Sequence, residues 1–273
     1  MHTHQEFEPN SEFREIVKCF WYDYRTFDEP GSVFEVLPDG YTEIIFYFGK
    51  LQLLSANGEF QTLPSPFLAG LLNEPLYFRS DSKLEVIGIR CFPWGIFNLL
   101  NLPADKGKLH LLENSIAALQ PQLAALLAAN KISEAIALSQ SYLLAILNGA
   151  SGDHRVSKAG EAIRAAHGTL PVSEVAEVIH STVRTLERNF KQSAGRTVKD
   201  VSALVRFEQV RNRLWANPEL QLAGLAHELG YTDQAHLSKE FKRFSRTTPA
   251  AFARNAKKQK RVFSDNFVAF IQS

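Results

Sequence analysis

The sequence has few of the features that would set it apart from an ordinary folded protein. Its 2 cysteines, Cys19 and Cys91, are far apart and lack metal-ligand spacing. We expect both to be reduced thiols packed in the interior. No apolar run reaches the length of a membrane span, and the first residues lack the basic and apolar regions of a secretory signal. These absences favour a cytoplasmic protein without a disulfide framework or a membrane segment.

The sequence signatures of the common enzyme classes are also missing. There is no Gly-rich phosphate loop, no nucleophile elbow and no cysteine cluster. His2, His4 and Glu6 lie close together, but in a terminal segment that we expect to be mobile. Asp39 lies near Glu43, but its position beside Gly40 is better explained by an Asx turn than by a catalytic pair of carboxylates. We therefore predict no enzymatic activity, no metal site and no cofactor.

Charge is divided unevenly along the chain. Residues 1–150 contain 10 Lys and Arg against 17 Asp and Glu, whereas residues 151–273 contain 20 against 12. The overall net charge of +1 therefore conceals an acidic half and a basic half. Such asymmetry indicates that only the C-terminal half meets a polyanion.

The first hundred residues have the pattern of short strands. Segments rich in β-branched and aromatic residues are separated by turns that contain Pro or Gly, and they span 16–24, 33–37, 42–48, 51–55 and 84–92. Asn57-Gly58 predicts a hairpin. We expect a small β-sandwich or barrel-like domain. Over 113–128 and 131–147 the apolar spacing becomes helical, so two helices follow, which either cover the sheet or form a dimer contact.

A short polar segment, 149–154, is the best linker, and it divides an N-terminal domain over 1–148 from an all-α domain over 155–254. The second domain contains an internal repeat. Val175, Ala176, Ile179, Leu186 and Phe190 recur as Leu225, Ala226, Leu229, Leu237 and Phe241. Each copy predicts a short helix, a tight turn and a longer helix, with Ser173 capping the short helix of the first copy and Thr182 and Thr232 beginning the longer helices. A long helix over 197–216, with a capping box at Thr197 and Asp200, joins the copies.

The longer helix of each copy has two different faces. Val183, Leu186 and Phe190 form the apolar stripe of the first, and Leu237, Phe241 and Phe244 that of the second. The opposite face carries cations and amides. A recognition helix in the major groove of DNA needs this division, because one face anchors the helix and the other reads base edges. The alternative is a pair of ordinary solvated faces, which the repeat and the basic charge make the weaker interpretation.

These residues resemble the AraC/XylS family of transcription regulators over about 155–254. The resemblance is strongest in 225–244, 248–252 and 183–191. It implies a seven-helix domain that binds double-stranded promoter DNA and usually activates transcription together with RNA polymerase. Carried over by position, the base-facing residues are Arg184, Glu187, Arg188, Gln234, His236 and Lys239, and the phosphate contacts are Lys191, Lys242 and Arg243. Arg246 replaces an expected glycine and Val198 an expected proline.

The N-terminal segment resembles an uncharacterised β-rich domain found before some such DNA-binding domains. One hypothesis is a pocket for a small-molecule effector, lined by the aromatic residues Trp21, Tyr22, Phe46, Phe48 and Trp94. The alternative is a domain that only forms a homodimer or binds a partner, with constitutive DNA binding. A third is a fused catalytic or metal-dependent domain. The apolar tail over 255–273 predicts a strand that packs on the body. The fold class expected overall is α+β.

Overall fold

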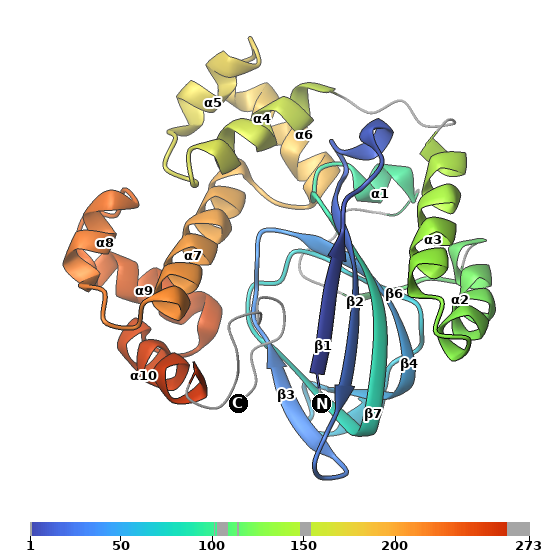
Figure 1. The fold of residues 1–273 in the computed structure, drawn as a ribbon. Coiled ribbons are helices and arrows are strands. Elements are labelled where there is room, and N and C mark those ends of the chain that lie inside the picture. Colours follow the sequence, from blue (N-terminus) through green and yellow to red (C-terminus); the bar gives the residue numbers. More distant parts are fainter. Residues whose placement is uncertain (1, 101, 103–108, 114, 148–153, 261–273) are drawn as a thin grey trace.

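The computed structural model describes residues 2–100, 102, 109–113, 115–147 and 154–260. A strongly bent antiparallel sheet forms its centre, with two helices along one side and a group of helices on the other (Figure 1). The α+β class is therefore confirmed. None of the described helices has the length and apolar character needed to cross a membrane.

Eight strands make up the sheet, in the order β1-β2-β7-β4-β6-β8, with β3 paired to β7 and β5 to β4. The strands are β1 His2–Phe7, β2 Val17–Thr26, β3 Ser32–Val36, β4 Thr42–Leu54, β5 Phe60–Thr62, β6 Phe67–Ala69, β7 Leu76–Cys91 and β8 Leu109–Leu111. Two predicted segments, 42–48 and 51–55, join in the single long strand β4. The short strands β5, β6 and β8 were not predicted, because three residues carry too little alternation to be recognised.

The two faces of the sheet form separate cores, because successive strand residues point to opposite sides. Phe20 and Tyr22 of β2 belong to the core beneath the helices α2 (Leu119–Ala128) and α3 (Ile132–Leu147), whereas Cys19 and Trp21 belong to the opposite core. Leu123 and Ile136 are buried against the sheet. The structure thus shows that these helices cover the sheet.

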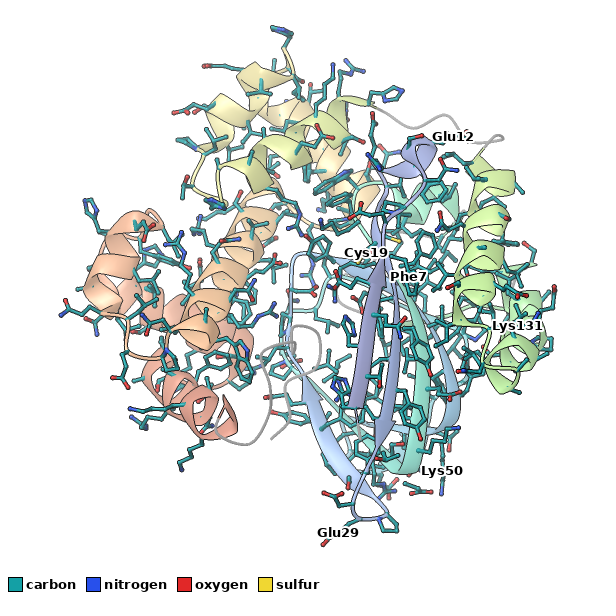
Figure 2. The ribbon with its side chains drawn as sticks, in the orientation of Figure 1. Phe7, Glu12, Cys19, Glu29, Lys50 and Lys131 are labelled. Carbon is teal, nitrogen blue, oxygen red and sulfur yellow. The ribbon has the colours of Figure 1, made fainter. Side chains whose placement is uncertain are left out.

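The two cysteines are free thiols inside the domain, as predicted. Cys19 lies near the beginning of β2, among the side chains of the sheet (Figure 2). Burial raises the pKa of the Cys19 thiol to about 12. It also raises the pKa of Cys91 well above its usual range. Neither thiol is therefore ionised near neutral pH, which a reactive cysteine requires.

The N-terminus differs from the expected mobile segment. Residues 2–7 form β1 and pair with residues 20–25 of β2 in full register. The rings of His2 and His4 both lie against the Asp23 carboxylate, at 2.8 and 3.2 Å. Ladder hydrogen bonds and these side-chain contacts hold the segment in place. The residues His, Thr, His, Gln and Glu over 2–6 do not alternate between apolar and polar, so the sequence carried no signal for this strand.

Short helices complete the N-terminal part: the 3₁₀ turns η1 (Ser11–Phe13) and η2 (Ser115–Ala118) and the helix α1 (Ile96–Leu99). The C-terminal part contains seven described helices: α4 His154–Ala165, α5 Val172–Val178, α6 Val183–Ala194, α7 Val198–Ala216, α8 Leu222–Glu228, α9 Gln234–Ser245 and α10 Pro249–Lys260.

The predicted segment boundaries in the C-terminal half shift at two places. Residue 154, placed in the linker, is the first residue of α4, and 148–153 lie outside the described residues. The helix α10 extends through residue 260, so the first six residues of the predicted tail are helical rather than extended. The remaining residues, 261–273, and with them the predicted strand, lie outside the described residues.

Candidate nucleic-acid interface

The first helix-turn-helix unit consists of α5 and α6. Its turn places His180 in the left-handed region, at φ 50°. The backbone N–H of Thr185 donates to the Thr182 hydroxyl at 3.2 Å, so Thr182 is the N-cap of α6 as predicted. Gly195 ends the helix in the left-handed conformation, at φ 66°. Ser173 was expected to cap α5, but the N-cap is Pro171, so the helix begins two residues earlier than predicted.

The second unit consists of α8 and α9 and repeats this geometry. Gly230, at φ 69°, occupies the turn position of His180. The N-cap of α9 is Asp233, which accepts a hydrogen bond from the His236 backbone at 2.7 Å, and not Thr232 as predicted. A carboxylate at this position also interacts favourably with the positive end of the helix dipole. Arg246 ends the helix at φ 58°, a conformation that costs a non-glycine residue roughly 1–2 kcal/mol.

The inward faces of both longer helices are buried largely as expected. Leu186 and Phe190 of α6 and Leu237 and Phe241 of α9 are almost inaccessible to solvent. Val183 is the exception, since 43% of it is exposed. It lies in the first turn of α6, before the helix reaches its scaffold, so the apolar stripe of the first unit is one residue shorter than predicted.

The structure places the predicted reading residues on the outward faces of α6 and α9. Arg184 and Arg188 on α6 are exposed, and so are Gln234, His236 and Lys239 on α9. Glu187 differs from them, because it is half-buried and its carboxylate accepts a hydrogen bond from the backbone N–H of Val198 at 3.1 Å. This bond satisfies a free donor at the N-terminus of α7. A position predicted to face a base thus also joins α6 to α7.

The predicted phosphate contacts extend these faces. Lys191 and Lys242 are exposed at equivalent positions of the two helices, one turn beyond the base-facing residues. Arg243 is exposed as well, and its guanidinium lies 3.5 Å from the Asp200 carboxylate at the start of α7. Arg243 therefore exchanges an internal partner for any phosphate that it binds.

The helix α7 carries both units. Thr197 and Asp200 form the predicted capping box at its beginning. Phe207 in its middle lies 5.0 and 5.2 Å from the rings of Phe241 and Phe244, so it supports the second reading helix from behind. Arg206 donates to the Gly168 carbonyl at 2.7 Å and to the Glu240 carboxylate of α9 at 3.1 Å. One arginine thereby links the end of α4 to the second reading helix.

Two protein-family models match the chain. Residues 175–255 match a helix-turn-helix domain, and residues 5–110 match a domain of unknown function (DUF6597). The chain carries a C-terminal AraC-type helix-turn-helix domain behind an N-terminal DUF6597 domain. An AraC-type domain indicates a DNA-binding transcription regulator. No curated protein matches the chain significantly in sequence.

Solved structures resemble the chain at low sequence identity. ToxT from Vibrio cholerae O395, bound to (E)-4-(8-methylnaphthalen-1-yl)but-3-enoic acid, is 13% identical with a TM-score of 0.49, covering 87% of this chain and 99% of that one. Wild-type ToxT from V. cholerae strain SCE256, bound to an unsaturated fatty acid, is 12% identical with a TM-score of 0.48, over 90% and 96%. The C-terminal domain of AraT, a response regulator from Geobacillus stearothermophilus, is 24% identical with a TM-score of 0.36, over 42% and 92%.

The DUF6597 domain contributes side chains to the core of the AraC-type domain. Leu37, Leu71 and Trp94 are buried in the same cluster as Phe190 and Phe207. The sequence did not indicate this, because a residue's partner in another domain leaves no local periodicity. The buried contacts show that the two domains share one apolar core.

The five aromatic residues proposed as an effector pocket are not brought together. Tyr22, Phe46 and Phe48 belong to the core beneath α2 and α3, Trp21 to the opposite core, and Trp94 to the core shared with the AraC-type domain. They were grouped by residue type alone, and strand alternation separates them.

A small cavity does lie inside the bent sheet. It has a volume of about 50 Å³ and is lined by apolar side chains such as Phe34, Ile45 and Phe78, with Glu43 at one side. Arg90 donates to the Glu43 carboxylate at 2.7 Å. Burial raises the pKa of Glu43, an effect that Arg90 opposes. Pockets for drug-sized ligands measure about 300–1,000 Å³, so the cavity as it stands is too small for such an effector.

A cluster of ionisable groups joins β1 to β2 beside the Trp21 ring. The Asp23 carboxylate lies between His2, His4 and Arg25, whose Nε donates to it at 2.8 Å. Burial alone lowers the pKa of His4, but its hydrogen bonds to Asp23 and Glu6 outweigh that effect and raise the pKa to about 9. Burial raises the pKa of Asp23, but its bonds to the two histidines reverse this and lower it.

The raised pKa of His4 predicts a pH dependence of stability. A group whose pKa is higher in the folded state stabilises the fold below its unfolded pKa, and this stabilisation is lost as the pH rises through the folded value. The contribution of His4 should therefore decline between pH 6.5 and about 9. In denaturant unfolding across that range, the chain should lose stability relative to His4→Gln. The exposed His227→Gln variant should follow the wild type, and parallel curves for all three proteins would contradict the assignment.

Proposed function

We propose that the chain recognises specific promoter sequences by inserting α6 and α9 into successive major grooves, and that it activates transcription together with RNA polymerase. The observation that carries the proposal is the repeated geometry of the two units, each with a buried inner face and exposed cationic and amide side chains opposite it. The connector α7 has 19 residues, a length of roughly 28 Å. This is close to the roughly 34 Å that separates successive major grooves on one face of the duplex.

The side chains suggest distinct roles within this proposal. Arg184 and Arg188 suit bidentate contacts with guanine, and Gln234 suits adenine. His236 and Lys239 complete the reading face of the second unit. Glu187 can accept from cytosine, but it would first have to leave the N-terminus of α7. We therefore assign it a role in orienting α6 as well as in reading DNA.

For the DUF6597 domain we infer a mainly structural role, with DNA binding that needs no effector. Its aromatic residues fill three separate cores, and the apolar cavity inside its sheet is small. Control by a small molecule is the second candidate, and the apolar cavity beside Glu43 and Arg90 is the feature that favours it. Binding there would require the sheet to open further. Dimerisation through this domain, and the absence of catalytic activity, belong to the same proposal.

Genome-wide selection of bound DNA fragments with the full chain tests the proposal. We expect the wild type to enrich a common bipartite sequence whose halves are about one helical turn apart. A variant with Arg188→Ala and Lys239→Ala should enrich it poorly while remaining folded, because both changes are on exposed side chains. If the wild type enriches no sequence over random fragments, the proposed function is wrong. Ligand control is tested by repeating the selection with protein purified under denaturing conditions and refolded, which removes any bound molecule.

Lys191→Ala should weaken binding evenly across sequences. As a phosphate contact, Lys191 releases about one counterion, so the slope of log affinity against log salt concentration should flatten by about one unit. Affinity for cognate and random duplexes, measured at several salt concentrations, checks this. Lys131→Ala removes the same charge from an exposed site between α2 and α3, where the lysine is paired with Glu134 (Figure 2). An equal change of slope in both variants would show that Lys191 acts only through net charge.

A further inference from the structure

A single loop of the DUF6597 domain contacts the ends of both reading helices. Residues 70–75 connect β6 to β7. Arg196, which directly follows the last turn of α6 and is 4% exposed, donates to the Leu71 carbonyl at 2.8 Å. Three residues along the loop, the Glu74 carboxylate pairs with Arg246, the residue that ends α9. Gly195, the residue before Arg196, and Arg246 are the equivalent C-caps of α6 and α9, so the loop contacts both units where their longer helices end.

The first reading helix is also supported from behind by Trp94. The Trp94 ring lies 6.3 Å from the ring of Phe190 on α6 and stacks on Phe92 at 5.1 Å. On its other side it lies against Gly160 of α4, so closely that a Cβ atom there would be 2.5 Å from the ring. Trp94 is 3% exposed, so these neighbours enclose it. The DUF6597 domain therefore sets the distance of α4 and α6 from its own surface.

A second loop, residues 37–41, holds α4 against α7. The Arg211 guanidinium on α7 donates to the Pro38 carbonyl at 3.1 Å, and Arg164 on α4 donates to the Gly40 carbonyl at 2.7 Å. Arg164 also stacks on Tyr41, 3.7 Å from the ring centre, and contacts Glu208 of α7 at 3.3 Å. These hydrogen bonds are buried or half-buried, so opening the interface would leave polar groups without partners.

We propose that these loops position the two reading helices relative to each other and so set the spacing of the DNA half-sites that the chain accepts. The inference rests on the proposed function. Without the loops, α7 and the contacts made by Arg206 are the main connection between the units. With the loops, both reading helices are held against the same surface of the DUF6597 domain. Arg196, Trp94 and Arg246 are then positioning residues, which act on DNA through the placement of α6 and α9.

Two glycine variants of the full chain form a matched pair for the test. Both Gly160 and Gly224 lie in helices, where alanine is normally preferred. A Cβ at Gly160 would strike Trp94, whereas one at Gly224 would have no atom within 4 Å. Gly160→Ala therefore displaces the interface, and Gly224→Ala changes only helix propensity. Arg246→Gly is a third variant, and it removes the contact with Glu74. Because glycine suits the left-handed conformation at this position, the change does not strain the end of α9.

The readout is affinity for the selected bipartite duplex and for versions with one base pair added or removed between its halves. Each base pair shifts the second half-site by about 3.4 Å and rotates it by about 35°. The wild type and Gly224→Ala should lose about 5-fold or more in affinity at the altered spacings, the effect of at least one misplaced base contact. Gly160→Ala and Arg246→Gly should bind the altered duplexes to within about 3-fold of the original.

Outcomes separate this inference from the proposed function. If the wild type binds no duplex specifically, both are wrong. If it binds and all folded variants retain the same spacing penalty, the DUF6597 loops do not position the helices and only the further inference is overturned. If Gly160→Ala does not fold, Arg246→Gly decides: an unchanged spacing penalty overturns the inference, and a flattened one supports it. If Arg246 served only to end α9, Arg246→Gly would have unchanged or improved stability and would lose as much affinity as the wild type at the altered spacings.

Discussion

Replacing Phe207 with alanine is expected to lower the free energy of unfolding by about 3–5 kcal/mol, the usual cost of emptying a buried phenylalanine site. The side chain is fully buried and contacts the rings of Phe241 and Phe244. Removing it leaves a cavity directly behind the second reading helix. Denaturant unfolding monitored by circular dichroism measures the loss.

Matched controls separate packing from helix content in this experiment. Phe207→Leu retains most of the volume and should cost clearly less. Lys199→Ala, on the exposed side of the same helix, should change stability by no more than about 0.5 kcal/mol. If Phe207→Ala were as mild as Lys199→Ala, the packing of α7 against α9 would be different from that described. DNA binding should weaken at the second half-site in particular, because α9 loses its support.

The second large effect concerns DNA. Arg188→Ala should weaken binding to the selected sequence by about 1–3 kcal/mol, or about 5- to 150-fold, and should relax the preference at one base position. A smaller loss is expected on random duplexes, where only the general attraction of charge is removed. Competition binding against a panel with each base of the site replaced in turn measures both quantities.

Arg254→Ala is the control for charge. It removes one exposed guanidinium from α10 in the same domain, away from the outward face of α6. We expect it to affect cognate and random DNA alike and to leave base preference unchanged. Should Arg188→Ala behave in the same way, Arg188 would be a general cation on the surface and not a base-reading residue.

The comparison of sequence with structure shows where local signals suffice. The buried stripe and the beginning of α6 depend on residues within one or two turns of each other, and Leu186, Phe190 and Thr182 all take the predicted places. Where two neighbouring residues are both good N-caps, the predicted N-cap was one residue away from the observed one. Thr232 and Asp233 are both good N-caps, and the structure uses Asp233.

The predictions of a mobile N-terminal segment and of an aromatic pocket were wrong for a different reason. The placement of β1 depends on pairing with residues of β2 that are 13 to 23 positions away, and the carboxylate that holds both histidines is Asp23. Trp21 and Tyr22 are adjacent in sequence but face different cores. Periodicity indicates that a residue is buried, and it does not indicate which of several cores receives it.

The two helix-turn-helix units, their joining helix and the outward residues could be predicted from the sequence, because neighbours three and four positions apart specify an α-helix and the repeat contains the pattern twice. How these units meet the sheet could be seen only in the folded chain. Trp94 against Gly160, Arg196 on the Leu71 carbonyl and Glu74 beside Arg246 join residues between 66 and 172 positions apart. Such contacts arise from the complementary shape and polarity of two folded surfaces, which no short stretch of chain encodes.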